Sequence, residues 1–89
     1  MTIVKRAQAL GFVVVQTGGN CTAWRRVIER DGKLAEQFIT LEKDPVAPSW
    51  KTNKVVIGTY TVVDGLWDVI SEGPFTFGEL LDRLEQGDA

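Results

Sequence analysis

The stretch FVVVQ (residues 12–16), TGGN (17–20) and CTAWRRVIER (21–30) decides the fold. Its first part is an almost continuous apolar run, which is typical of a strand that is covered on both faces and lies centrally in a sheet. The two glycines of the second part tolerate the positive φ angles of a tight turn. The third part alternates as a strand does, which places Arg25 and Arg26 on opposite faces. Together these residues predict a β-hairpin.

Two Asp-Gly pairs predict further hairpins. Asp31-Gly32 and Asp64-Gly65 each stand between stretches with strand character, and Asp-Gly favours the two-residue turns that join antiparallel neighbours. The long segment Asp44–Lys54 between these hairpins contains two prolines, which exclude the interior of a regular strand or helix. The remaining predicted strands are Leu34–Lys43, Val55–Val63 and Leu66–Ser71, with Gly73-Pro74 ending the last of them.

A helix is predicted at each end of the chain. Thr2–Leu10 carries one apolar stripe at helical spacing, and Gly11 follows where a glycine commonly ends a helix. Thr76 and Glu79 have the spacing of a capping box, in which each side chain can satisfy a free N–H of the first turn. This box introduces a helix over Phe77–Gln86, whose apolar stripe should cover one face of the sheet.

The predicted fold class is therefore α+β, in a single domain over residues 1–89. A short N-terminal helix precedes a five-stranded, mainly antiparallel meander sheet, and the C-terminal helix packs on one face of that sheet. The chain has 89 residues, of which 44% are hydrophobic and 25% charged, values that are ordinary for one globular domain.

The cysteine content and the hydropathy pattern favour a cytoplasmic protein. One cysteine cannot form an internal disulfide, which is typical of a reducing compartment. No apolar run reaches the length of a membrane span, and the first residues lack the pattern of a secretory signal. We therefore expect no membrane partner.

The charges divide unevenly along the chain although the net charge is only −2. Residues 1–54 carry nine Lys/Arg and five Asp/Glu, a balance of +4, whereas residues 55–89 carry one Arg and seven Asp/Glu, a balance of −6. Such a dipolar surface either steers a charged partner or is only solvated. An acidic helix face would suit a basic protein partner, whereas nucleic acid needs the basic half to be contiguous.

Several chemistries lack the residues that they need. The chain has no histidine, which removes the commonest general base and the commonest metal ligand. Cys21 therefore has no histidine to activate it, and it is either a small buried residue or a thiol activated by Arg25 or Arg26. Neither a phosphate-binding glycine loop nor a dinucleotide fingerprint is present. We expect neither an enzyme nor a bound cofactor or metal.

Aromatic and basic residues supply the candidate binding site, which comprises Trp24, Arg25, Arg26, Arg30 and Trp50. On one interpretation, the strand from Trp24 to Arg30 stacks the bases and holds the phosphates of a single-stranded nucleic acid. On the other, Trp24 belongs to the core and alternation divides the arginines between two faces. Trp50, in the proline-bearing segment, either folds back over the sheet or anchors a protein partner, since tryptophan and arginine are enriched at binding hot spots.

Two segments resemble small orphan proteins encoded by bacteriophages and prophages. They are Thr17-Gly18-Gly19-Asn20-Cys21-Thr22-Ala23-Trp24 and, much later, Val56-Ile57-Gly58-Thr59-Tyr60, which are 13 of the 89 residues. The resemblance carries no catalytic motif and implies a short intracellular protein that binds a host factor.

The sequence thus favours a small non-enzymatic domain that acts through contact with a protein partner or with a second copy of itself. Three observations support this prediction: the missing catalytic groups, the sheet edges and the aromatic residues at positions expected to be exposed. The alternative is a protein that binds single-stranded nucleic acid through the strand from Trp24 to Arg30.

Overall fold

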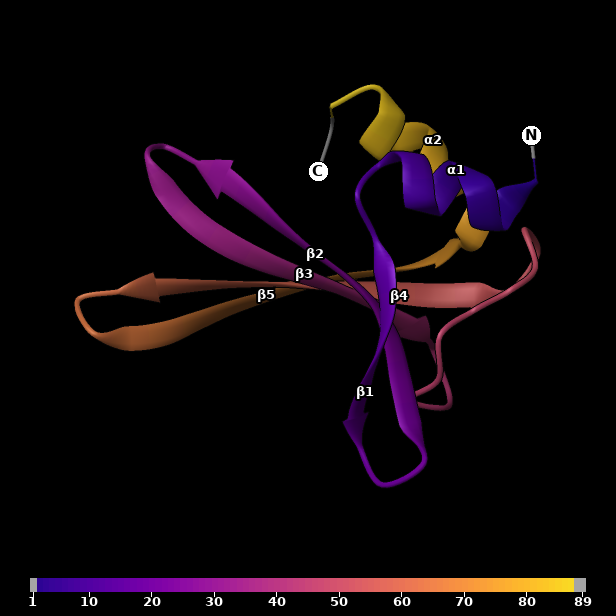
Figure 1. The fold of residues 1–89 in the computed structure, drawn as a ribbon, viewed down its shortest axis with the longest axis horizontal. Coiled ribbons are helices and arrows are strands. Elements are labelled where there is room, and N and C mark those ends of the chain that lie inside the picture. Colours follow the sequence, from indigo (N-terminus) through magenta and orange to yellow (C-terminus); the bar gives the residue numbers. More distant parts are fainter. Residues whose placement is uncertain (1, 88–89) are drawn as a thin grey trace.

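A five-stranded antiparallel sheet and two helices make up the fold (Figure 1). The computed structural model describes residues 2–87. Its strands follow one another in the order β1-β2-β3-β4-β5, each antiparallel to the next, so the predicted α+β meander is confirmed. The elements are α1 (Ile3–Ala9), β1 (Val13–Gly18), β2 (Cys21–Arg30), β3 (Lys33–Leu41), β4 (Lys54–Val63), β5 (Leu66–Thr76) and α2 (Phe77–Glu85).

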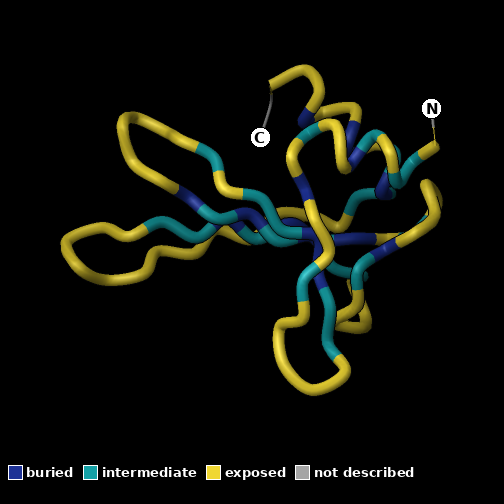
Figure 2. The backbone as a smooth tube through the Cα atoms, viewed as in Figure 1, coloured by how far each residue is buried: buried dark blue, intermediate teal, exposed yellow. Residues whose placement is uncertain are grey.

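Both helices lie together over one face of the sheet (Figure 1). The apolar stripe of α2 packs against buried residues of β2, β3 and β4 and forms most of the core with them. Figure 2 shows the buried residues concentrated beneath the helices, whereas the ends of the hairpins are exposed. The core residues are Ala7, Phe12, Trp24, Ile39, Val55, Ile57, Phe77, Leu80, Leu81 and Leu84.

The turns have the backbone conformations that the Asp-Gly pairs predict. Asp31 and Asp64 both have φ of 52°, and the glycines that follow them have φ of 77° and 80°. Two successive residues with positive φ match the twist of the flanking strands, which favours long hairpins. The hairpins β2–β3 and β4–β5 accordingly project well beyond the helices (Figure 1).

Trp24 fastens the long connection between β3 and β4 to the core. Its indole Nε1 donates a buried hydrogen bond of 2.7 Å to the carbonyl oxygen of Pro48, and its side chain is only 4% exposed. The ring also lies 6.5 Å from that of Phe77, which opens α2. Trp24 therefore links β2, the connection and α2.

Arg6 joins the two helices through their charged sides. Its guanidinium donates hydrogen bonds to both carboxylate oxygens of Glu85, at 3.1 and 2.6 Å, and another to Asp82. These hydrogen bonds raise the pKa of Arg6, and the bond from Arg6 lowers the pKa of Glu85 below its ordinary value of 4.5. The basic start and the acidic end of the chain thus meet between α1 and α2.

Two details of the predicted sheet are wrong. The run that begins at Phe12 was expected to form a central strand, but β1 lies at the edge, and Val13 and Val14 are each more than half exposed. Only Phe12, just before the strand, reaches the core. Gly73-Pro74 does not end the last strand, because β5 resumes pairing with β4 at Phe75 after an irregularity in register. An edge strand tolerates proline, since its missing N–H can face solvent.

Within residues 2–87, no helix combines the length and the hydropathy that crossing a membrane would require.

We expect Trp24→Phe to lower the free energy of unfolding by about 1–3 kcal/mol. The substitution keeps an aromatic ring but leaves the buried carbonyl of Pro48 without a donor. The matched control is Trp50→Phe, which alters a side chain that is 70% exposed and should change stability by less than about 0.5 kcal/mol. Denaturant unfolding measures both, and equal effects would contradict the assigned role of Trp24.

The contact between the helices should make stability depend on pH. Because the pKa of Glu85 is lower in the folded chain, its pairing with Arg6 stabilises the fold above the ordinary glutamate pKa and is lost as the pH falls through the lowered value. We therefore expect Arg6→Met to reduce stability at pH 7, with a difference from the unaltered chain that shrinks as the pH falls below 4.5. Urea unfolding over this pH range tests the expectation, and a difference independent of pH would refute it.

Candidate functional site

The face of the sheet opposite the helices carries apolar side chains that no described element covers. We call this side the open face. Strand alternation and pairing bring its residues together from all five strands, and several are about half exposed or more. Its exposed large apolar residues are Val13, Val27, Leu34, Val62, Trp67 and Val69.

Three aromatic rings form a row across the middle of the open face. The rings of Phe38 and Tyr60 meet edge to face with centroids 5.4 Å apart, and those of Tyr60 and Trp67 do the same at 6.4 Å. Gly58, the partner of Phe38 in the β3–β4 pairing, makes room for this row. A Cβ at Gly58 would lie 3.1 Å from Cε1 of Tyr60, so the tyrosine ring occupies the place of the missing side chain.

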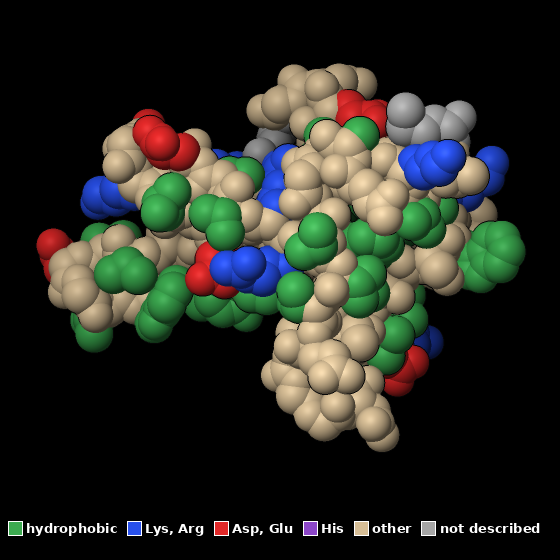
Figure 3. All heavy atoms as spheres, in the orientation of Figure 1, with side chains coloured by type: hydrophobic (Ala, Val, Ile, Leu, Met, Phe, Trp, Pro, Cys, Tyr) green, Lys and Arg blue, Asp and Glu red, His purple; other side chains and the backbone are tan. Residues whose placement is uncertain are grey.

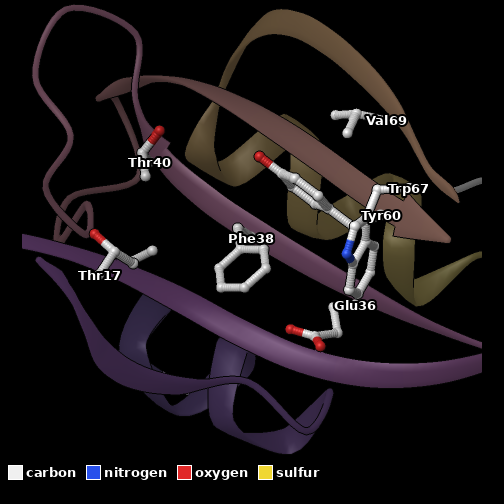
Figure 4. A pocket seen from close by; sticks show the side chains of 8 residues that line it. Thr17, Glu36, Phe38, Thr40, Tyr60, Trp67 and Val69 are labelled. Atoms are coloured by element: carbon white, nitrogen blue, oxygen red, sulfur yellow. The ribbon is translucent and has the colours of Figure 1, made fainter. Parts of the chain in front are cut away.

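The aromatic row borders a hollow of about 640 Å³. Figure 4 shows the rings of Phe38, Tyr60 and Trp67 around this space, with Thr17 of β1 on its far side from Trp67. Its size falls in the range of small-molecule sites. The lining residues are Thr17, Ala23, Glu36, Phe38, Thr40, Tyr60, Trp67 and Val69.

The open face is nearly neutral at its centre. Arg25 Nε donates a hydrogen bond of 3.1 Å to Glu36 Oε2, and each side chain is about one third exposed. Because this arginine is already paired with a carboxylate, the surface does not offer the run of free cations that a phosphate backbone requires. What it offers a partner is apolar and aromatic contact.

The structure does not bring the five predicted site residues together. Trp24 lies in the core and so is not available to stack a base or meet a partner. Arg25 and Arg26 are on opposite faces, as the alternation predicts, and Arg30 is exposed at the end of β2. Trp50 lies on the connection between β3 and β4. The strand from Trp24 to Arg30 therefore forms no continuous aromatic and basic surface.

Arg26 fastens the end of α1 to the sheet. Its guanidinium donates hydrogen bonds to Gln37 Oε1 at 2.7 Å and to the Leu10 carbonyl at 3.1 Å, and it lies 4.7 Å from the centre of the Phe12 ring. Burial, with a smaller contribution from Arg30, lowers the pKa of Arg26. A cation at the C-terminal end of a helix satisfies carbonyls that lack helical partners, which is a structural role.

Trp50 combines an ordered backbone with an exposed ring. Asn53 Oδ1 accepts a hydrogen bond of 3.0 Å from the Trp50 N–H, and the Asn53 N–H donates to the Trp50 carbonyl at 3.1 Å. The first N–H groups of α2, from Phe77 and Gly78, donate to carbonyls of the same segment. Since 70% of the side chain is exposed, Trp50 does not cap the sheet.

Cys21 is half-buried at the start of β2 and forms no disulfide. Within residues 2–87, no three side chains of His, Cys, Asp or Glu gather in a way that could hold a metal ion.

The aromatic row was not recognised as a site from the sequence. Alternation does place Tyr60 with Val62, and Trp67 with Val69, on the same sides of their strands. Which side of β3 faces the helices is not evident from its residues: Gln37 and Ile39 are the buried ones, so Phe38 between them lies on the open face. The signal that could have revealed the row is Gly58, because it interrupts a strand rich in β-branched residues. A glycine inside a strand often marks the close approach of another group.

Comparisons of the chain with models of protein families, with curated proteins and with solved structures found no match.

We expect Gly58→Ala to displace the Tyr60 ring while changing the free energy of unfolding by less than about 1 kcal/mol. Among residues 2–87, the ring supplies the nearest contacts of the added Cβ, and it is partly exposed and can move. NMR shifts of the Phe38 and Trp67 rings report the displacement. In contrast, Gly73→Ala should cost more than about 1 kcal/mol, because its φ is 135° and its Cβ would lie 3.0 Å from the Val55 carbonyl oxygen. Unmoved ring signals in Gly58→Ala would contradict the assigned packing.

Proposed function

We propose that the chain is a small non-enzymatic binding domain that contacts a protein partner through the open face. One observation carries this proposal: the row Phe38, Tyr60 and Trp67 borders a hollow on a sheet face that no described element covers. Trp67 is 62% exposed, a large apolar area to leave in water.

The chemistry of the open face suits a protein contact. Tryptophan and tyrosine are enriched at binding hot spots because they bury much area with few rotatable bonds. The backbone of β3 and β4 is hydrogen-bonded on both sides, so this part of the face is a firm platform. The ion pair between Arg25 and Glu36, each about one third exposed, can form hydrogen bonds with a partner.

The same groups give little support to catalysis. The carboxylate that lines the hollow is that of Glu36, which is paired with Arg25. The remaining polar side-chain groups there are hydroxyls and the indole N–H of Trp67, and the chain has no histidine to activate a hydroxyl. The nucleic-acid alternative loses its stacking residue in Trp24, which is buried.

The resemblance to small orphan phage and prophage proteins stays a prediction. If it is right, the partner is a host protein, and the single cysteine fits the reducing cytoplasm in which the two would meet.

A capture experiment with matched tryptophan variants tests the proposal. The tagged protein, Trp67→Ser and Trp50→Ser are each incubated with a bacterial lysate, with and without nuclease, and bound proteins are identified by mass spectrometry. Trp67 and Trp50 are comparably exposed, at 62% and 70%, so the two variants differ mainly in which surface they alter. We expect one identified protein to be retained after nuclease and by Trp50→Ser, but lost with Trp67→Ser.

Purified components then measure the loss. A hot-spot tryptophan contributes about 2 kcal/mol or more to the free energy of binding. Trp67→Ser should therefore raise the dissociation constant measured by calorimetry by about 30-fold or more. Circular dichroism checks that the variant is folded. Capture that disappears with nuclease, or that depends on Trp50 and not on Trp67, would overturn the proposal.

A further inference from the structure

The β4–β5 hairpin exposes apolar side chains on both of its faces. It extends past the helices, so neither the helix side nor the open face is covered there (Figure 1). Hydrophobic side chains gather over this end of the molecule in Figure 3, on the left. Of the twelve exposed large apolar residues among residues 2–87, six lie on this hairpin, namely Val62, Val63, Leu66, Trp67, Val69 and Ile70.

β5 is also an edge of the sheet, with its outer backbone groups free of any strand partner among the described residues. The turn determines which groups these are. Val63 and Leu66 flank a two-residue turn and pair with each other, so they form a hydrogen-bonded pair, and every second residue of β5 likewise bonds to β4. The backbone groups of Trp67, Val69 and Ser71 therefore point outward.

We propose that two copies of the chain associate by pairing β5 with β5 in antiparallel fashion, around a two-fold axis at Val69. This inference goes beyond the proposed function and does not depend on it. Val69 pairs with itself across the axis, and Trp67 of each copy pairs with Ser71 of the other. All of these residues have outward backbone groups, so each pair can form two hydrogen bonds.

The other registers that pair outward residues with each other are worse. An axis at Asp68 or at Ile70 would place Asp68 directly opposite Asp68 or Glu72 of the other copy, respectively. An axis at Ser71 would bring the Gly73-Pro74 irregularity into the pairing, where the proline has no N–H to donate. An axis at Trp67 would centre the pairing close to the Asp64-Gly65 turn and so leave fewer paired residues. The axis at Val69 uses the regular part of the strand, residues 66–72, in full.

The charges of β5 agree with an axis at Val69. Asp68 and Glu72 are its acidic residues in the regular part, and like charges directly opposite each other destabilise a strand pair. An axis at Val69 places Asp68 opposite Ile70 and Glu72 opposite Leu66 of the other copy. No carboxylate then lies directly opposite another.

The apolar area on β5 fits a reversible dimer. Leu66, Trp67, Val69 and Ile70 are between 47% and 74% exposed. Together they leave on the order of 400 Å² per copy in water, about half of the roughly 800 Å² per partner of a standard interface. The polar backbone edge supplies part of the remainder, so we expect a dimer whose population depends on concentration.

β1, the other edge strand, is the weaker candidate for self-pairing. It has six residues against eleven in β5, and its pairing with β2 is irregular between Gln16 and Gly18. Pairing of β1 with β5 of another copy would use two different surfaces, which leads to open-ended assemblies rather than a closed dimer.

Cysteine variants on neighbouring strands test the proposal directly. In a Cys21→Ser background, Val69→Cys is compared with Val62→Cys under mild oxidation. Both valines are on the open face of the same hairpin and are equally exposed, at 47% and 45%, but Val62 lies on the inner strand β4. Paired residues across the axis have Cα atoms about 5.5 Å apart, within the range that a disulfide spans.

We expect Val69→Cys to form a covalent dimer and Val62→Cys to remain monomeric. Sedimentation of the unaltered chain should show a shift from monomer to dimer with concentration. Equal crosslinking of both variants would mean that the open faces meet and would overturn the β5 pairing, as would a chain that sediments as a monomer throughout. Circular dichroism checks that both variants are folded, and neither outcome depends on whether a partner is captured.

Discussion

A mismatch of lengths governs this structure, because the helices are much shorter than the strands that they cover. A helix of nine residues, such as α2, is about 13 Å long, whereas a strand of ten residues, such as β4, spans about 33 Å. The helices can therefore bury only part of one face. The ends of the hairpins and much of the open face are left to solvent, and both proposed contact surfaces follow from this limit.

The core is completed by contacts that tie distant segments to the covered region. Trp24 holds the β3–β4 connection through Pro48, and Arg26 holds the end of α1 through the Leu10 carbonyl. Two residues that the sequence offers as binding candidates thus serve the fold. The charge division along the chain is partly cancelled in the same way, since Arg6 meets Asp82 and Glu85. The basic N-terminal part and the acidic C-terminal part of the chain thus come together at the two helices. The charge separation in space is therefore smaller than the separation along the sequence suggests.

Local chemistry was enough to predict the elements of the fold. The Asp-Gly turns and the capping Thr76 act within a few residues, and the structure has them as predicted, except in one detail of the cap. The Thr76 hydroxyl accepts from the Glu79 N–H and itself donates to the Glu79 carboxylate, 2.9 Å away. The central position expected for β1 was wrong because it relied on the apolar run alone, which does not distinguish an edge strand from a central one. The predicted meander already places its first strand at an edge, as the structure does.

The candidate site was harder to predict than the fold because it depends on register between strands. Phe38, Tyr60 and Trp67 come from three strands, and only the pairing of Phe38 with Gly58 and of Tyr60 with Val69 brings their rings into one row. Single strands show which residues share a side, but not which side the helices take. A shift of one residue in β3 would exchange Phe38 for Gln37 or Ile39 on the open face.

The two proposed surfaces are compatible, since they use different groups of the same hairpin. Pairing through β5 uses its outward backbone, whereas the aromatic row projects side chains perpendicular to the sheet. A two-fold axis normal to the sheet places both open faces on the same side of a continuous ten-stranded sheet. A dimer of this kind presents two equivalent sites to one partner surface, and linked sites bind a repeated or dimeric partner more tightly than either site alone. The β4–β5 hairpin therefore serves two contacts in the proposed dimer: the backbone edge of β5 joins the two copies, and the side chains of the hairpin form one wall of each hollow.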